Sequence, residues 1–247
     1  MRQFLRNWLV ALTQLWPRPA FLYLPHYFAD WIRYRRSSGK NRPRVLDSYP
    51  CLTDRVAHTP FDPHYFYQAG WLARRLPEAP PKIHVDVGSS VMMLNVLSAF
   101  AETVFVDYRP LPAKLTKLYP VAGDMARLPF ADASVASISC LHVIEHIGLG
   151  RYGDALDTEG SQKAAVELAR VVSPGGRLYL SAPVGRERVC FNAHRVFDPD
   201  GLAGMFPGMS LVEFSFVDDR GRLHEHQSPE RARSNDYACG LYIFFKQ

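Results

Sequence analysis

HVDVGSS, at residues 84–90, gives the strongest indication of fold in this sequence. The apolar residues Ile83, Val85 and Val87 lead up to Gly88, and two serines then open a segment rich in Met and Leu. This pattern predicts a buried strand that passes through a turn of small residues into a helix. At such a turn, the backbone N–H groups of the helix start point toward a polar or anionic ligand.

A second acid, Asp107, lies about twenty residues farther on, at the end of the apolar run at residues 103–106. Nucleotide-binding sheets commonly place a carboxylate at this distance, where it binds the ribose hydroxyls. The alternative is a structural turn followed by a surface acid, because strand–Gly–helix turns also occur in α/β proteins that bind no nucleotide.

Two further segments carry a more specific pattern: VAGDMARLPFADASVASISCLHVIEHI at residues 121–147 and ELARVVSPGGRLYLSAPV at residues 167–184. Together with the first turn, they resemble the class I S-adenosylmethionine-dependent methyltransferases over roughly residues 80–185. The residues that match the family pattern in order are Gly123, Asp124, Leu128, Pro129, Phe130, Asp132, Ser134, Val143, Ile144, Glu145 and His146. The resemblance implies a Rossmann-like α/β fold, a seven-stranded mostly parallel sheet with a terminal antiparallel hairpin, and S-adenosyl-L-methionine as the cofactor.

Three other segments resemble, more narrowly, a family of methyltransferase-like proteins found with bacterial surface-polysaccharide genes. They are EHIGLGRYGD at residues 145–154, FNAHRVFDPDGL at residues 191–202 and DYACGLYIF at residues 236–244. This narrower resemblance implies that the methyl acceptor is an oxygen of a sugar, in a surface glycan or its lipid-linked precursor. The residues themselves do not name the acceptor.

The broader resemblance also implies which residues contact the cofactor. They are Asp86, Gly88, Ser89, Ser90, Asp107, Tyr108, Asp124, Met125 and Leu141. Asp86 would either orient the turn and the methionine amino group or simply cap the helix. Asp107 would accept hydrogen bonds from the ribose, and Asp124 from the adenine amino group. The chain departs from the usual G-x-G-x-G run, because it has Ser90 and Met92 at the second and third positions, and the bulk of Met92 bears on cofactor affinity.

Two histidines are candidates for a general base. His142 follows the predicted strand at residues 134–141, at the carboxyl edge where open α/β sheets bind ligands. A neutral imidazole near pH 7 suits removal of a hydroxyl proton, and we favour His142 over His194, which lies in a later polar loop beside Arg195. Arg195 could bind an acceptor carboxylate or phosphate. The alternative for both histidines is a structural, hydrogen-bonded role. We expect no metal site, because HVIEH has its acid in the wrong place for an H-E-x-x-H zinc motif.

Composition limits the class of protein. A chain of 247 residues with 47% hydrophobic and 21% charged residues is ordinary for a globular protein and excludes a predominantly disordered one. The cysteines Cys51, Cys140, Cys190 and Cys239 lie far apart without a C-x-x-C pair, which indicates neither a zinc ribbon nor a disulfide framework. We therefore expect a reducing, cytoplasmic location. No apolar run reaches the roughly eighteen residues that span a bilayer.

Basic residues are concentrated near the N-terminus, where the first 44 residues contain nine Lys or Arg and one acid, Asp30. Residues 1–35 also place Trp8 and Trp16 among leucines at helical spacing, and Trp and Tyr beside Arg suit a membrane interface. We expect this segment to make peripheral contact with anionic lipid at the inner face of the cell membrane. The alternative is packing on its own domain or on a second subunit of a homodimer. No nucleic-acid partner is expected, because no motif of a known module is present.

Strands and helices alternate through most of the chain, which favours parallel strands with right-handed crossovers. The expected strands are residues 83–87, 104–107, 119–122, 134–141, 177–182, 211–217 and 240–245, and the expected helices are residues 65–76, 92–101 and 162–172. We expect two domains: residues 1-80 form a helical, aromatic and basic extension with its lead-in, and residues 81-247 form the S-adenosylmethionine-binding methyltransferase domain.

The sequence thus predicts an S-adenosylmethionine-dependent methyltransferase that acts on a small-molecule or glycan acceptor in polysaccharide biosynthesis. One alternative is a C- or N-methyltransferase that acts on a quinone or another small molecule. The other is a non-catalytic scaffold with a degenerate methyltransferase fold, which the missing glycines suggest.

Overall fold

The computed structural model describes residues 1, 5, 8–9 and 20–247, and its internal contacts divide the chain into two units, Met1–Phe61 and Asp62–Gln247. The boundary falls before helix α3 (Pro63–Arg75) rather than near residue 80, because Trp71 and Leu72 of this helix are buried in the core of the second unit. Most of the helix predicted near the N-terminus, including Trp16, lies outside the described residues.

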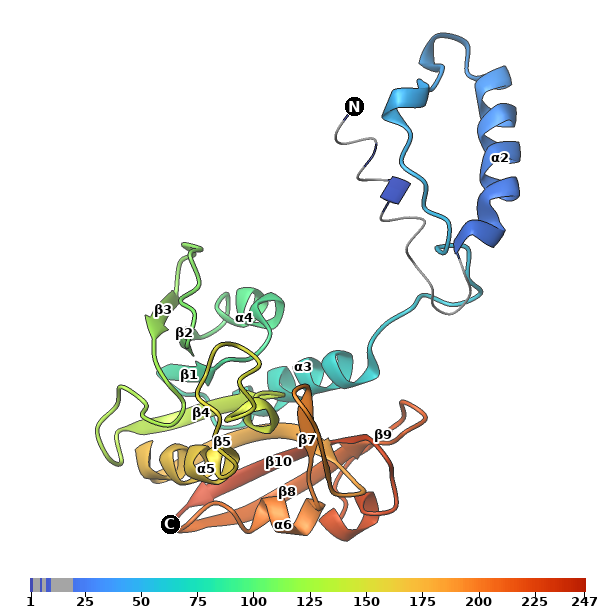
Figure 1. Ribbon diagram of the computed structural model, residues 1–247. Coiled ribbons are helices and arrows are strands. Elements are labelled where there is room, and N and C mark those ends of the chain that lie inside the picture. The colour runs from blue at the N-terminus through green and yellow to red at the C-terminus, as the bar shows by residue number, and fades with distance from the viewer. Residues whose placement is uncertain (2–4, 6–7, 10–19) are drawn as a thin grey trace. The chain divides into compact units, whose positions relative to one another are not determined.

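The first unit contains helix α2 (Leu24–Ser37), drawn in blue in Figure 1. Short 3-10 helices flank it: η1 (Ala20–Tyr23), η2 (Gly39–Asn41) and η3 (Val45–Asp47). A small cluster forms where Leu52 packs against Tyr23, Leu24 and Tyr27, but no residue of α2 itself is buried. Throughout the described part of the chain, no helix combines the length and the apolar character needed to cross a bilayer.

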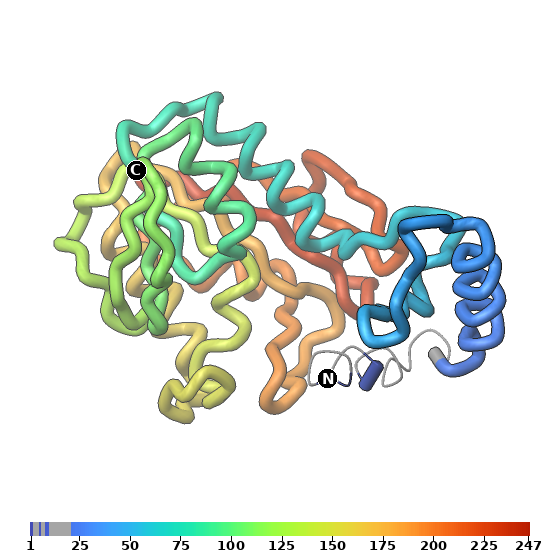
Figure 2. Tube along the Cα trace, turned by 90° about the horizontal axis from the view of Figure 1, so that it is seen from above, coloured from blue at the N-terminus to red at the C-terminus, as the bar shows by residue number. Residues whose placement is uncertain are grey.

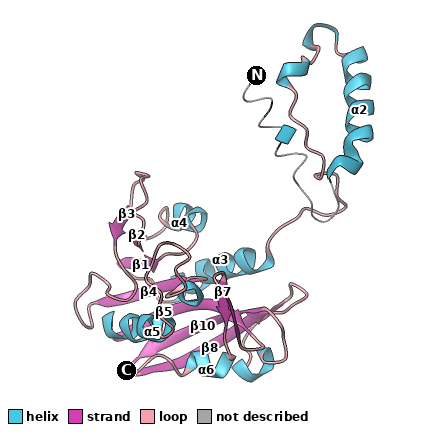
Figure 3. Cartoon of the chain, in the orientation of Figure 1, coloured by secondary structure: helices cyan, strands magenta, loops and turns pink. Residues whose placement is uncertain are grey.

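The second unit is built on an eight-stranded sheet with the order β3-β2-β1-β4-β5-β10-β8-β9 (Figure 3). Its strands are β1 (Ile83–Val87), β2 (Glu102–Asp107), β3 (Leu118–Ala122), β4 (Val135–Leu141), β5 (Val172–Val184), β8 (Met209–Val217), β9 (Leu223–His224) and β10 (Ala238–Lys246). The pairs from β3 to β5 are all parallel, whereas β10 is antiparallel to both β5 and β8. The structure therefore confirms the mostly parallel α/β sheet with a terminal antiparallel segment.

The sheet has one strand more than the seven that were expected, because β9 pairs with the free edge of β8. A separate two-stranded sheet, β6 (Arg188–Cys190) and β7 (His194–Val196), follows β5. Strands of two or three residues are too short to show an alternating apolar pattern, so local periodicity does not predict them.

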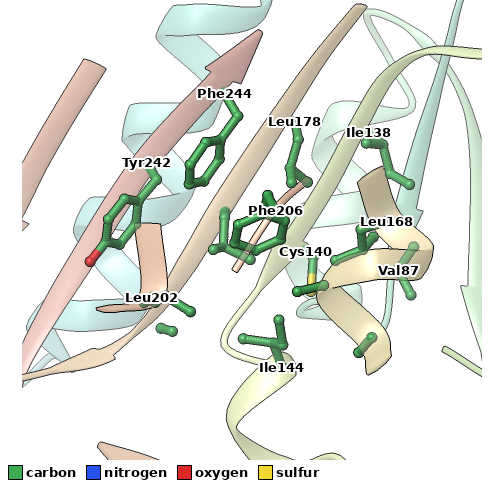
Figure 4. Close-up of a cluster of buried hydrophobic side chains, with 14 of the residues drawn as sticks. Val87, Ile138, Cys140, Ile144, Leu168, Leu178, Leu202, Phe206, Tyr242 and Phe244 are labelled. Carbon is green, nitrogen blue, oxygen red and sulfur yellow. The ribbon is translucent and has the colours of Figure 1, made fainter. Parts of the chain in front are cut away.

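Helices cover both faces of the sheet (Figures 1 and 2). On one face, α3 and α4 (Val91–Leu97) pack against residues of the sheet such as Phe105 and Leu241. On the other face lie α5 (Gly160–Val171) and α6 (Pro199–Ala203), and Figure 4 shows Leu168 and Leu202 of these helices among buried side chains of the sheet. The remaining 3-10 segments are η4 (Leu76–Glu78), η5 (Ile144–His146) and η6 (Pro229–Ala232).

A chain of buried polar groups runs beneath the first turn of the sheet. The ring nitrogens of His84 bind two serine hydroxyls, Nδ1 that of Ser137 at 2.8 Å and Nε2 that of Ser139 at 2.9 Å. Ser139 also donates a hydrogen bond to Oδ2 of Asp86, its partner across the β1–β4 pair. Burial lowers the pKa of His84 to about 3, so the ring is neutral and links the two serines without adding a charge.

Candidate functional site

The turn after β1 places the backbone of Gly88 and Ser89 at the carboxyl edge of the sheet, beside the end of β4. Gly88 has φ +69°, and a Cβ on it would lie 2.9 Å from Cγ1 of Val143, so a larger residue would be both strained and crowded. Ser89 fixes the turn from both sides: its N–H donates to Oδ1 of Asp86 at 3.1 Å, and its hydroxyl accepts from the N–H of Leu141 at 2.9 Å. The end of β1 is thereby tied to the end of β4.

Asp86 is fully buried below this turn and lines neither of the two cavities described next. Burial raises its pKa to about 6, although hydrogen bonds from Ser139 and Ser89 act in the opposite direction. Asp86 therefore orients the turn, one of the roles expected from the sequence, and it does not cap α4, whose N-cap is Ser90.

A small cavity of about 120 Å³ lies beside Gly88 at the carboxyl ends of β1 and β2. Its lining includes five of the residues expected to bind the cofactor: Gly88, Asp107, Tyr108, Asp124 and Met125. Oδ1 of Asp107 accepts the N–H of Arg109 at 2.6 Å, and the guanidinium Nε of Arg109 also approaches Oδ1, at 3.7 Å. Oδ2 of Asp107 is therefore the oxygen left for a ligand.

The other positions in this small cavity also suit a nucleoside. Asp124 is exposed, and its Oδ1 accepts the N–H of Ala126 at 2.8 Å. Met125 is buried, whereas Tyr108 is 55% exposed and free to cover a planar ring. A Cβ on Gly123 would lie 2.5 Å from Cγ1 of Val106, so only glycine leaves the floor open. These residues fit the adenosine half of S-adenosylmethionine.

Met92 does not obstruct the turn. It belongs to the first turn of α4 but is 72% exposed, and it lines neither cavity. The bulk that the sequence places at the third position of the glycine run therefore points away from the ligand. The N-cap of α4 is Ser90, which lines the second cavity.

The second cavity adjoins the first and is larger, at about 560 Å³. Residues from the start of α3, from the turn after β1, from the end of β4 with the segment after it and from three later segments line it: Asp62, His64, Tyr65, Gly88, Ser89, Ser90, Val91, Leu141, His142, Glu145, His146, Arg151, Tyr152, Ala193, His194 and Tyr237. Gly88, His142, His146 and Tyr152 line both cavities. This arrangement places a second ligand directly beside one held in the small cavity.

His142 and Glu145 form a buried pair at the junction of the cavities. Nδ1 of His142 lies 2.8 Å from Oε1 of Glu145, and the two side chains are 5% and 1% exposed. Burial opposes the positive charge of His142, but Cys239 and Glu145 beside it outweigh this and raise its pKa well above the usual value. Within the described structure, Nε2 of His142 and Oε2 of Glu145 are buried without a hydrogen-bond partner.

Aromatic rings form a continuous stack along the larger cavity. The ring of His142 stacks with those of Tyr65 and His64, with centroid distances of 5.6 and 5.4 Å. His64 stacks on Tyr237 at 5.3 Å, and Tyr237 contacts His194 at 5.0 Å. The cavity thus offers ring faces as well as polar edges to a ligand.

The loop after η5 closes the side shared by the two cavities. Its Tyr152 ring lies under two guanidinium groups, those of Arg109 at 4.5 Å and Arg151 at 5.1 Å from the ring centroid. Asp154 holds the loop, because its Oδ2 accepts the N–H groups of Gly148 and Gly150 at 2.9 and 3.3 Å.

The two histidines near Arg151 differ from His142 in charge. Burial lowers the pKa of His194 and of His146, so both rings are neutral near pH 7. Nδ1 of His146 is engaged by the carbonyl of Ala193 at 2.7 Å. His194 is half-buried and lines the larger cavity.

Arg195, considered from the sequence as an anion-binding residue, lines neither cavity. Its guanidinium donates to the carbonyl of Ile147 at 2.6 Å and to the hydroxyl of Ser161 at 3.1 Å. Arg195 therefore braces the loop, whereas the exposed Arg151 is the arginine that lines the larger cavity.

Sequence reasoning missed several cavity residues. His64 and Tyr65 lie on α3, outside every recognised segment, so no signal pointed to them. Arg151, Tyr152 and Tyr237 had a signal, because they belong to EHIGLGRYGD and DYACGLYIF. The three segments of the narrower resemblance, far apart along the chain, meet at this cavity.

Comparison with solved structures relates the fold to methyltransferases. The N-methyltransferase NodS from Bradyrhizobium japonicum, in complex with S-adenosyl-L-homocysteine, has a TM-score of 0.53 at 14% identity, covering 77% of this chain and 89% of that chain. A Burkholderia thailandensis 1,6-didemethyltoxoflavin-N1-methyltransferase with bound S-adenosylhomocysteine has a TM-score of 0.52 at 15% identity, covering 90% and 91%. The chain thus has the Rossmann-like fold of class I methyltransferases.

The same fold also serves other chemistry, since the [4+2]-cyclase SpnF matches with a TM-score of 0.51 at 13% identity over 73% of this chain and 80% of that chain. A family model described as "Caenorhabditis protein of unknown function, DUF268" matches residues 128–239. This match spans most of the three segments that meet at the larger cavity. A search of curated proteins found no match.

Proposed function

We propose that this chain is an S-adenosylmethionine-dependent methyltransferase that methylates an oxygen of a sugar, in a surface glycan or its lipid-linked precursor. The observation that carries the proposal is the pair of adjoining cavities that meet at Gly88 and His142. The smaller cavity is lined by residues suited to an adenosine, and the larger one offers space and polar groups for an acceptor.

Different residues of the small cavity contact different parts of the cofactor. Oδ2 of Asp107 accepts from the ribose hydroxyls, and Asp124 and Met125 bind the adenine edge and face. Gly88 allows the backbone to approach the methionine portion closely. When bound, S-adenosylmethionine supplies an electrophilic methyl group, whose bonding electron pair stays on the departing sulfur.

Several features support a sugar acceptor. The exposed ring of Tyr65, at one end of the stack, can pack against the apolar C–H face of a sugar, and neighbouring polar groups can bind its hydroxyls. Arg151 adds a positive charge that suits a phosphate or carboxylate on the glycan or its carrier. The narrower sequence resemblance to proteins of surface-polysaccharide gene clusters points the same way, because its segments line this cavity.

The chain's part in the reaction is to orient the acceptor hydroxyl and to remove its proton. We assign the proton to a ring nitrogen of His194, because this histidine is neutral near pH 7 and reachable from the cavity. His142 is less suited to accept a proton, since its raised pKa keeps it protonated. Its pairing with Glu145 instead fixes the wall between the two cavities.

The experiment is a transfer assay with S-adenosylmethionine labelled on its methyl group. Sugar acceptors, free and lipid-linked, are compared with quinone and amine acceptors, and the methylated atom is identified by mass spectrometry and NMR. Label on a sugar oxygen supports the proposal. Label on carbon or nitrogen of a small molecule would favour the C- or N-methyltransferase alternative. Binding without transfer to any acceptor would favour a non-catalytic scaffold.

We also propose that the N-terminal segment contacts anionic lipid, which would bring the enzyme to a lipid-linked acceptor. Helix α2 leaves Phe28 and Ile32 exposed on a helix that ends with Arg35 and Arg36. Arg35 lies 5.0 Å from the ring centroid of Trp31, so aromatic and basic groups are combined as membrane interfaces require.

A further inference from the structure

Three potential metal ligands from distant parts of the sequence converge next to the larger cavity. They are His64 in the first turn of α3, His142 directly after β4, and Cys239 in β10. One ligand atom from each lies within 4.8 Å of the other two. Asp62, the N-cap of α3, fixes the position of His64 by accepting its backbone N–H at 2.9 Å.

One ring nitrogen of His142, Nε2, is available to a ligand. Glu145 occupies Nδ1 at 2.8 Å, and Nε2 is buried without a hydrogen-bond partner among the described residues. Without an ion this nitrogen carries a proton and has no hydrogen-bond partner, and a bound ion would replace that proton and satisfy the atom. The side chain of Cys239 is also fully buried, and its sulfur lies beside the ring of His142 and 3.9 Å from the carbonyl oxygen of Gly240.

We propose that His64, His142 and Cys239 form a zinc site. Zn²⁺ prefers donors such as one thiolate and two imidazoles. Hard cations such as Mg²⁺ and Ca²⁺ prefer oxygen ligands instead. Bond lengths of about 2.0–2.1 Å to nitrogen and 2.3 Å to sulfur place tetrahedral ligand atoms about 3.3–3.6 Å apart. The three ligand atoms now lie within 4.8 Å of one another, so side-chain rotations that move them by about an ångström bring them to this geometry.

Glu145 is not a ligand in the proposed site, but it orients the His142 ring. Histidines that bind zinc commonly donate their other ring N–H to a carboxylate, which fixes the tautomer and the direction of the ring. The Glu145–His142 contact has this form, with the carboxylate on Nδ1 and Nε2 directed to the ion. The motif HVIEH alone predicts no metal site, whereas the structure brings His142 together with residues 78 positions before it and 97 positions after it.

Three protein ligands leave the fourth position of a tetrahedral ion open. His64 and His142 both line the larger cavity, so an oxygen of a ligand bound there can occupy this position. For an acceptor hydroxyl, coordination would lower its pKa and ease transfer of its proton to His194. This catalytic role rests on the proposed methyl transfer, but zinc binding itself does not.

The test measures metal binding by the full-length protein, independently of activity. The protein is stripped with a chelator and titrated with Zn²⁺ against a chromophoric competitor, and then with Co²⁺ as a spectroscopic probe. We expect one tightly bound ion per chain and a thiolate-to-cobalt charge-transfer absorption. Cys239→Ser should abolish this absorption and weaken zinc binding. His64→Ala should also weaken binding, and Glu145→Gln should do so by about 10–100-fold.

Cys51→Ser is the matched control, because Cys51 is exposed and belongs to the first unit. It should bind zinc and cobalt as the unaltered protein does. His64 is only half-buried, so His64→Ala remains informative if Cys239→Ser does not fold. Absence of zinc binding to the unaltered protein would overturn the proposal. So would equal affinity of the unaltered protein and the His64→Ala variant, because the ion would then bind elsewhere.

Discussion

Nδ1 of His142 lies 2.8 Å from Oε1 of Glu145, in a pair that is almost wholly buried where the two cavities meet. A buried carboxylate fixes both the orientation and the protonation of the imidazole that it contacts. The protein therefore fixes the orientation and protonation state of the His142 ring before any ligand binds. The proton of the acceptor must then go to another group, and His194 is one of the neutral histidines that line the same cavity.

Asp107→Ala should weaken binding of S-adenosylmethionine by about 1.5–3 kcal/mol, the usual contribution of a hydrogen bond to a charged group. Calorimetric titration of the folded variant measures the change. Glu102→Ala is the control, because Glu102 is exposed at the opposite end of the same strand. If both variants bind the cofactor like the unaltered protein, the ribose does not lie on Asp107.

His194→Ala should lower turnover by about 10²–10⁴-fold, the contribution typical of a positioned base, with little change in cofactor affinity. Its zinc content should stay the same, since His194 is not one of the three proposed ligands. His142→Ala should lose both zinc and turnover. Turnover that falls only in His142→Ala, with zinc retained, would return the role of base to His142, as the sequence first suggested.

The stability of the ligand-free protein should depend on the ionisation of Asp86. Burial raises the pKa of this carboxyl from 3.8 to about 6, and His84, which is linked to it through Ser139, is neutral across this range. The folded state therefore binds the proton more tightly than the unfolded state does, and this stabilisation is full below pH 4 and is lost as the pH rises through 6.

Asp86→Asn cannot ionise, so it should gain about 3 kcal/mol of unfolding free energy relative to the unaltered protein between pH 4 and pH 7. Urea unfolding of both proteins at several pH values measures this difference. A difference that stays constant with pH would mean that Asp86 is not strongly perturbed.

Vesicle binding should depend on the basic residues of the first unit. Full-length protein should bind anionic vesicles, more weakly as salt rises, and should bind neutral vesicles little. Replacing Arg35 and Arg36 by Glu should reduce sedimentation with anionic vesicles. The same change at the exposed Lys114 and Lys117 of the second unit is the control. Equal binding by both variants would place the lipid contact elsewhere or exclude it.

The parallel half of the fold could be predicted because each strand there is an apolar run that ends in a turn or an acid. The strand predicted at residues 83–87 coincides with β1, and those predicted at 119–122 and 134–141 differ from β3 and β4 by one residue at the N-terminal end. The late strands β8 and β10 were also expected, although their position beside β5 depends on contacts between distant segments. The boundary near residue 80 differed from the structure because α3 packs on the sheet through residues such as Trp71.

The site could be predicted only where a local motif marks it. Asp107 and Asp124 follow strands in a familiar pattern, and both line the small cavity. Cys239 reaches His142 only because β10 inserts antiparallel beside β5, a pairing that local periodicity does not encode. Local periodicity also does not predict that His64, which lies on α3 and 78 positions before His142, contacts it.

The central claim is that the paired cavities hold S-adenosylmethionine, and calorimetric titration of the full-length protein tests it most directly. The account predicts saturable binding of one molecule per chain, with a Kd between about 1 μM and 1 mM. S-adenosylhomocysteine should compete for the site, and Asp107→Ala should weaken the binding. A cooperatively folded protein that shows no binding to either molecule at millimolar concentration would contradict the account.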